Sequence, residues 1–111
     1  MKKIKINGNF EIESEECKGI RKVFGLMFAS RRRARALLFS FSGKSRTAIH
    51  SFFVFFPFLA VWLDEKNRMI EKRIVNPFNP FVVPKKSYSK LVEIPLNEKY
   101  EKIVKTLVAK K

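Results

Sequence analysis

Residues 48–65 read AIHSFFVFFPFLAVWLDE. Five phenylalanines and a tryptophan fall within eleven consecutive residues of this stretch, in a chain of 111 residues with a net charge of +14. Pro57 divides the stretch, and apolar side chains occupy both odd and even positions on either side of it. Successive side chains of a strand point to opposite faces of a sheet. The pattern therefore predicts two central strands, 50–56 and 58–63, each buried on both faces.

A membrane-spanning helix is the alternative interpretation of this stretch. The apolar run from Thr47 to Leu63 has seventeen residues and includes His50, Ser51 and Pro57. A spanning helix needs about 20 apolar residues, and a proline does not favour an isolated helix. The sequence therefore predicts no transmembrane segment, whereas attachment of a basic face to anionic lipid stays open.

Apolar periodicity predicts further strands on both sides of this stretch. We expect them at residues 2–6, 10–13, 37–41, 69–75 and 88–94. Asn7-Gly8 is a tight-turn pair, residues 42–45 form an expected turn, and residues 64–68 form an expected polar hairpin loop. Together these elements favour a mostly antiparallel sheet or a partial barrel.

Two helices are expected to complete the fold. Ser14 can cap a helix in the N-terminal half that ends near Gly25, and Asn97 can cap a second helix near the C-terminus. The apolar face of the first helix consists of Cys17, Ile20, Phe24 and Met27. The stripe of the second consists of Tyr100, Ile103, Val104, Leu107 and Val108. We therefore expect one α+β domain, residues 1–111, a mostly antiparallel β-sheet or partial barrel with one N-terminal-half helix and a C-terminal amphipathic helix.

An ordered set of short motifs resembles the uncharacterised family called domain of unknown function 192. The motifs are Gly25-Leu26-Met27-Phe28, Ala36-Leu37-Leu38-Phe39-Ser40-Phe41, the segment from Phe56 to Asp64, and Leu91-Val92-Glu93-Ile94-Pro95. Their order covers roughly residues 14–96, as in a divergent member of that family. The resemblance implies a fold and no activity, because no biochemical activity is established for the family.

The chain departs from that family at its polar positions. Leu59 stands where the family has an aspartate after the proline, and Leu96-Asn97 replaces its late glycine. Residues 50–54 are HSFFV, where bacterial members carry an aromatic-Trp-Met-Lys-Asn-Thr pattern. A polar site built from those family residues is therefore absent from this sequence.

The sequence offers little for catalysis or metal binding. It contains one histidine, His50, one cysteine, Cys17, and one aspartate, Asp64, without the spacing of a catalytic triad. It lacks a zinc-type Cys/His cluster and a phosphate-binding glycine-rich loop. His50 as an acid–base group and Cys17 as a reactive thiol are both weaker interpretations than buried structural residues. The balance is against an enzyme, and we expect no cofactor and no metal.

Positive charge is concentrated in the middle of the chain. Residues 31–60 carry six basic side chains and no acidic one, a net charge of +6. The residues expected to bind an anion are Arg31, Arg32, Arg33, Arg35, Lys44, Arg46, Lys85 and Lys86. Guanidinium groups contact phosphate in a bidentate manner and provide salt-dependent, sequence-independent affinity. The leading hypothesis is a non-enzymatic module that binds a polyanion, nucleic acid being favoured; a solvated basic loop without a ligand is the alternative.

Aromatic residues supply the other hypotheses. Phe39 and Phe41 occupy alternating inward positions, and Phe78 and Phe81 of the Asn-Pro-Phe doublet are expected to anchor an irregular connection to the core. The second hypothesis is a protein-interaction or structural domain that uses an apolar surface or the C-terminal helix. The third is a small-ligand pocket near His50 and Trp62.

The N-terminus suggests a compartment. Its basic residues are not followed by the apolar run of a signal peptide, and a single cysteine is compatible with a reducing environment. We therefore expect a cytoplasmic protein.

Overall fold

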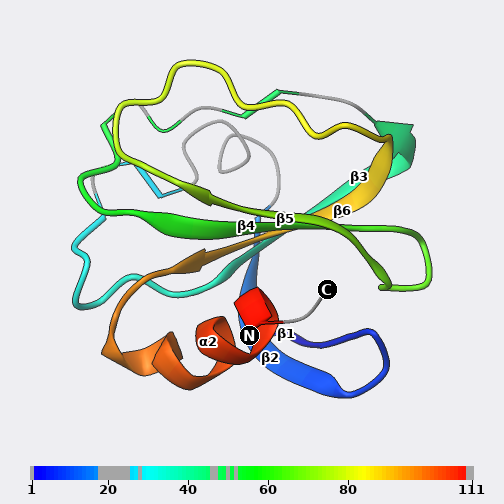
Figure 1. Cartoon of the computed structure of the whole chain (residues 1–111), viewed down its shortest axis with the longest axis horizontal. Coiled ribbons are helices and arrows are strands. Elements are labelled where there is room, and N and C mark those ends of the chain that lie inside the picture. Colours follow the sequence, from blue (N-terminus) through cyan, green and yellow to red (C-terminus); the bar gives the residue numbers. More distant parts are fainter. Residues whose placement is uncertain are drawn as a thin grey trace.

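The computed structural model describes residues 2–17, 26–27, 29–45, 48–49, 51 and 53–109, with the backbone alone for residues 42–45. The strands are β1 (Lys2–Ile6), β2 (Phe10–Cys17), β3 (Leu37–Ser45), β4 (Phe58–Leu63), β5 (Met69–Val75) and β6 (Tyr88–Pro95). They form one sheet in the order β1-β2-β3-β6-β4-β5 (Figure 1). Neighbouring strands are antiparallel except β2 and β3, which are parallel. A 3₁₀ turn, η1 (Glu98–Tyr100), leads into the helix α2 (Glu101–Ala109).

Strand β4 is the centre of the fold, as its sequence predicts. All of its residues are buried, and it pairs with β5 on one side and β6 on the other. Phe58, Ala60 and Trp62 pack into one apolar cluster, whereas the alternate residues of β4 pack into a second cluster. A strand with apolar side chains on both faces is stable only where both faces are covered. The predicted burial of 58–63 is therefore confirmed.

The two clusters occupy opposite faces of the sheet. One contains Tyr100 and Leu107 from η1 and α2 together with residues of β1 and β2. The other lies beneath the long connections between strands and includes Val54, Phe56 and Val82. Figure 1 shows α2 and the β1–β2 hairpin below the sheet and the long connections above it.

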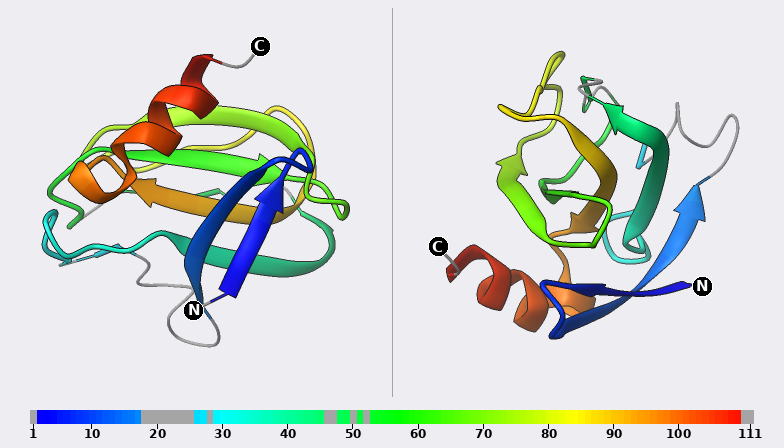
Figure 2. Two further views of the ribbon diagram at one scale, coloured as in Figure 1. Left: turned by 90° about the horizontal axis from the view of Figure 1, so that it is seen from below. Right: turned by 90° about the vertical axis from the view of Figure 1, so that its right-hand side faces the viewer.

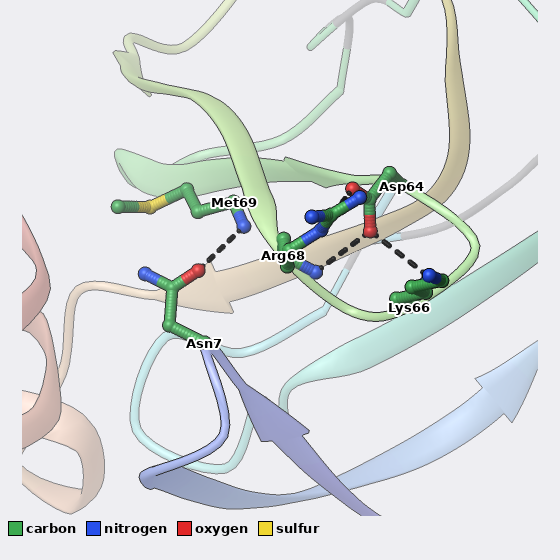
Figure 3. A network of polar contacts seen from close by, with 5 residues as sticks. All are labelled: Asn7, Asp64, Lys66, Arg68 and Met69. Carbon is green, nitrogen blue, oxygen red and sulfur yellow. Dashed lines mark hydrogen bonds and ion pairs between the residues drawn. The ribbon is translucent and has the colours of Figure 1, made fainter.

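The sheet curls into a half-barrel whose two edge strands approach each other (Figure 2). The backbone N–H of Asn7 donates to the carbonyl of Asn67 at 2.9 Å, and the N–H of Met69 donates to Asn7 Oδ1 at 2.8 Å (Figure 3). Asn7 and Gly8 have φ values of 55° and 78°, so the predicted tight turn is confirmed. Lys72 of β5 donates to the carbonyls of Leu107 and Val108 at the end of α2, which ties the helix to this edge.

The polar hairpin loop predicted at residues 64–68 is confirmed between β4 and β5, and the structure shows that Asp64 organises it. Its Oδ1 accepts the backbone N–H groups of Lys66 and Arg68, both at 2.9 Å, and Oδ2 accepts Arg68 Nε at 2.8 Å (Figure 3). Partial burial acts to raise the pKa of Asp64, but these hydrogen bonds and the Arg68 charge together hold it below its ordinary value.

The prediction of a helix from Ser14 to Gly25 is wrong for its described residues, 14–17. Ser14 and Cys17 belong to β2, and no helix occurs in the described residues of the N-terminal half. Ser14 is buried and donates to the carbonyl of Lys2 at 3.3 Å, and Cys17 is buried and pairs with Phe39. Strand neighbours on both sides outweigh the local capping pattern. The rest of the expected helix, residues 18–25, lies outside the described residues. In its described residues, the fold is thus a mostly β half-barrel with one C-terminal helix.

Two further details of the expected sheet are also wrong. Residues 42–45 are the end of β3, after a register shift beyond Ser40, and not a turn. The strand expected at 50–56 is absent from its described part, where Phe53 has a φ of 60° and Val54 and Phe55 are irregular. A left-handed residue cannot continue a pleated strand.

The amphipathic C-terminal helix is confirmed, but its expected cap is not. The side chain of Asn97 makes no capping hydrogen bond. Its Nδ2 donates instead to the carbonyls of Arg31 and Ala34, at 2.8 and 3.1 Å. Within the described ranges, no helix has the length and apolar character needed to cross a membrane.

Candidate anion-binding site

The arginine-rich segment forms a turn with a fixed backbone. The N–H groups of Arg33 and Ala34 donate to the carbonyl of Ser30, at 3.1 and 2.8 Å. The two hydrogen bonds from Asn97 hold the carbonyls of the same turn. The hydroxyl of Tyr100 accepts the N–H of Ala36 at 2.8 Å, immediately before β3 begins. Residues 30–36, called the arginine turn below, are therefore attached to the segment that leads into α2.

The side chain of Arg31 completes this attachment. Its Nε donates to the carbonyl of Leu96 at 2.8 Å, and the neighbouring Asn97 donates back to the Arg31 carbonyl. These two bonds leave the terminal Nη groups of Arg31, an exposed residue, available to a ligand. Two Nη groups form the planar fork that matches two phosphate oxygens.

A groove of about 770 Å³ is lined by residues of the arginine turn, of η1 and of α2. Its lining residues are Arg31, Arg32, Leu96, Asn97, Glu98, Lys99, Glu101, Val104 and Lys105. Leu96 and Val104 supply apolar surface, and four cations outnumber two carboxylates. Lys105 pairs with Glu101 at 3.2 Å, an exposed contact that adds little stability. The groove, called the arginine groove below, is suited to an anionic group with an apolar or aromatic neighbour.

The structure does not gather all the predicted basic residues in this groove. Arg33 and Arg35 line a separate cavity of about 250 Å³ with Glu15. Lys85 and Lys86 line another, of about 440 Å³, beside β5. The side chain of Lys44 and the whole of Arg46 lie outside the described residues. Of the predicted residues whose side chains are described, only Arg31 and Arg32 therefore meet in the arginine groove, where Lys99 and Lys105 join them.

Trp62, expected beside a pocket, lies in the packed core. It is fully buried, its ring is 6.4 Å from that of Tyr88, and the guanidinium of Arg73 lies 5.6 Å above it. Its Nε1 has no hydrogen-bond partner within the described part of the chain. His50, the other residue of that hypothesis, lies outside the described residues. The indole therefore offers no open wall to a ligand.

Glu93 is a buried ionisable residue to which the sequence analysis gave no role. It lies in β6 between its partners Leu37 and Ala60. No hydrogen bond or ion pair reaches its carboxyl from the described residues. Burial raises the pKa of Glu93 to about 8, so the carboxyl holds a proton at neutral pH. The sequence signal was a lone glutamate in the apolar run Leu91-Val92-Glu93-Ile94.

Four phenylalanines that the sequence analysis placed in a buried strand or as anchors to the core are exposed. Phe53, Phe55, Phe78 and Phe81 are between 49% and 70% exposed. The rings of Phe55 and Phe78 meet edge to face at 5.5 Å. The prediction that Phe78 and Phe81 anchor to the core is therefore wrong. By contrast, Phe39 is buried and the half-buried Phe41 packs on Tyr88, as their alternation predicts.

The C-terminal helix was one candidate surface for a protein partner. Tyr100 and Leu107 are buried, and Ile103 and Val104 pack against the same cluster. Most of the apolar stripe of this helix is thus used within the chain, and Val108 alone of its five residues is exposed. The exposed phenylalanines are an apolar surface that remains among the described residues.

Comparison of the chain with family models, curated proteins and solved structures finds no match. The resemblance to domain of unknown function 192 therefore stays a prediction. Function must be inferred from the arginine groove and its surroundings.

Proposed function

We propose that this chain is a non-enzymatic binding module whose arginine groove binds a polyanion, nucleic acid being the favoured class. One observation carries the proposal. The backbone of the arginine turn is hydrogen-bonded to the start of the helical segment, while Arg31 and Arg32 line a groove. A cationic fork on a fixed backbone loses little conformational freedom when it binds phosphate.

The charges of the chain itself support an external anion. Several carboxylates are already paired with other cations: Glu11 with Lys3, Glu16 with Lys2, Asp64 with Arg68, Glu71 with Arg73 and Glu101 with Lys105. Neither Arg32 nor Arg33 makes an ion pair in the parts of the chain that the structure describes. With a net charge of +14, a polyanion is the partner that long-range electrostatics favours.

Salt dependence and charge reversal test this proposal. We expect the logarithm of the affinity for a labelled duplex DNA to fall linearly with the logarithm of the salt concentration. The slope should be about −0.9 for each phosphate contacted. The double variant Arg31→Glu and Arg32→Glu should reduce affinity by at least about tenfold at low salt, because it removes the fork and adds repulsion. Fluorescence anisotropy measures both effects.

The control variant has the same net charge as the arginine variant, but its two substitutions lie far from the arginine groove. Lys5 and Lys66 are exposed at the opposite end of the sheet, near the turns that Asn7 and Asp64 organise. Lys5→Glu with Lys66→Glu should reduce affinity much less than the arginine pair. Equal losses from both pairs, or binding that does not respond to salt, would contradict a dedicated site.

A cytoplasmic location is part of the same proposal. The single cysteine, which is buried in β2, is compatible with a reducing compartment. Fractionation of cells that express a tagged full-length chain would test it.

A further inference from the structure

The sheet brings the arginine groove and the exposed phenylalanines to one end. In the register, Leu37 pairs with Glu93, Pro95 pairs with Phe58, and Phe58 pairs with Val75. The segments before β3, after β6, before β4 and after β5 therefore follow one another along a single edge of the barrel. Figure 1 shows all four at its left-hand end. Basic and aromatic segments that are far apart in the sequence thus become neighbours.

Hydrogen bonds link these neighbours in the same order. Arg31 Nε donates to the carbonyl of Leu96, and the N–H of Leu96 donates to the carbonyl of Pro57 at 3.1 Å. Phe55 lies two residues before Pro57 and its ring contacts Phe78. A connected path therefore runs from the guanidinium of Arg31 to the exposed rings.

The loops that carry the rings are fixed by Ser51. Its buried hydroxyl donates to the carbonyl of Asn76 and accepts the N–H of Asn79, both at 2.6 Å. Its carbonyl accepts the N–H of Phe78 at 2.9 Å. The loop before β4 is thereby joined to the loop after β5.

Phe53 and Phe78 have left-handed backbones with φ values of 60° and 61°. A bulky residue in this region costs about 1–2 kcal/mol, and about half of each ring stays exposed. Conformations of this kind persist where surrounding contacts impose them, and they occur often at binding sites. The fold thus holds these aromatic rings outward on a fixed backbone.

We propose that this end of the barrel binds single-stranded nucleic acid, with phosphates at Arg31 and Arg32 and bases stacked on Phe55 and Phe78. The inference rests on the proposed function and names its substrate class. Three strand spacings separate β3 from β5, about 14 Å along the sheet, which a few nucleotides can bridge. Basic grooves beside exposed aromatic rings bind single strands because every base offers a flat face for stacking.

Other partners fit these observations less well. A duplex stacks its bases on one another, so their faces do not reach the phenylalanines. A lipid bilayer is broad and flat, so it does not enter a groove between a turn and a helix. An apolar protein surface would cover the rings but would leave the cations beside them without an anion.

Three probes separate single strands from duplexes and from other polyanions: a labelled oligothymidylate, a duplex of the same length, and heparin, a polyanion without bases. Vesicles of phosphatidylserine and phosphatidylcholine test the membrane alternative. We expect the intact protein to bind the oligothymidylate more tightly than the duplex. The double variant Phe55→Ala and Phe78→Ala should weaken oligothymidylate binding by roughly 5- to 150-fold for each base unstacked. Heparin binding should not change. Val108→Ala, at an exposed apolar residue of α2, is the control and should leave all three affinities unchanged.

A spectroscopic variant reports stacking directly. Phe55→Trp places an indole at the proposed contact, whereas the native Trp62 is fully buried. Oligothymidylate should quench the new emission, and heparin should not. Because Phe55 is exposed, neither substitution at this position removes core packing.

The outcomes distinguish the two proposals. Unchanged oligothymidylate affinity in the phenylalanine variant, with a loss in the Arg31 and Arg32 variant, would overturn base stacking and keep the polyanion site. Unchanged affinity for every probe in the arginine variant would overturn both. A phenylalanine variant that loses binding only to vesicles of phosphatidylserine and phosphatidylcholine would overturn base stacking and assign the rings to a membrane instead.

Discussion

The two halves of the phenylalanine-rich stretch have similar composition and opposite roles. After Pro57, all residues of β4 are buried between β5 and β6. Before Pro57, Phe53 and Phe55 are about half exposed on an irregular segment, although Val54 and Phe56 between and after them are buried. Hydrophobicity alone therefore does not decide whether an aromatic residue belongs to a core or to a surface.

The two halves differ in the partners that satisfy their backbone hydrogen-bonding groups. In β4, strands on both sides accept and donate the peptide hydrogen bonds, so the apolar side chains can be enclosed. In the earlier half, Ser51 supplies hydrogen bonds to the loop at residues 76–79 instead. An irregular backbone held at the surface turns only some of its side chains inward.

The largest expected contrast comes from truncating one phenylalanine in each half. Phe58→Ala should lower the free energy of unfolding by about 3–5 kcal/mol, because it removes a buried ring and leaves a cavity. Phe55→Ala should change it by less than about 0.5 kcal/mol, since most of that ring faces solvent. Urea denaturation followed by circular dichroism measures both. Similar losses for the two variants would break the distinction between the halves.

The next effect concerns Glu93, which pairs with Ala60 in the core half. Its folded-state pKa is about 8, against an ordinary value of 4.5, because burial disfavours the charged form. The folded state keeps the proton while the unfolded state releases it. The stabilisation is therefore complete below about pH 4.5 and is lost as the pH rises to about 8. Between about pH 5 and 7 we expect a loss of roughly 2–3 kcal/mol, measured by urea denaturation.

Glu93→Gln is the matched control for this pH dependence. It keeps the size of the side chain and cannot ionise, so the loss between about pH 5 and 7 should disappear. Asp64 does not interfere, because its lowered pKa places its effect at more acidic pH, where stability falls as the carboxylate is protonated. An identical pH profile for the variant and the parent would show that Glu93 does not titrate in this range.

A smaller change in the free energy of unfolding is expected in the irregular half before Pro57. Ser51→Ala removes a buried hydroxyl that bonds to Asn76 and Asn79, and should cost about 1–3 kcal/mol of unfolding free energy. It should also weaken oligothymidylate binding more than heparin binding, because the rings lose their fixed positions. Ser30→Ala, at an exposed serine of the arginine turn, should cost less than about 0.5 kcal/mol. If Ser51→Ala affects neither stability nor binding, the loops are fixed by other contacts.

The candidate site was only partly predictable from the sequence. The cluster from Arg31 to Arg35 was visible as a run of like charges, but its division between two cavities was not. Lys99 and Lys105 join Arg31 only because Asn97 and Tyr100 attach the helical segment to the arginine turn. Contacts of this kind join residues more than sixty positions apart, and no local pattern encodes them.

The sequence by itself determined the elements that have a clear local pattern. These are the apolar strand β4, the polar loop at Asp64 and the apolar stripe of α2. These depend on neighbours a few residues away, so the pattern is sufficient. Only the tertiary structure decided that Ser14 and Cys17 extend a strand, that Glu93 is buried without a partner among the described residues, and that the exposed phenylalanines and the arginine turn lie at the same end of the sheet. Each of these depends on which segments pack together, because burial and hydrogen bonding there are supplied by distant parts of the chain.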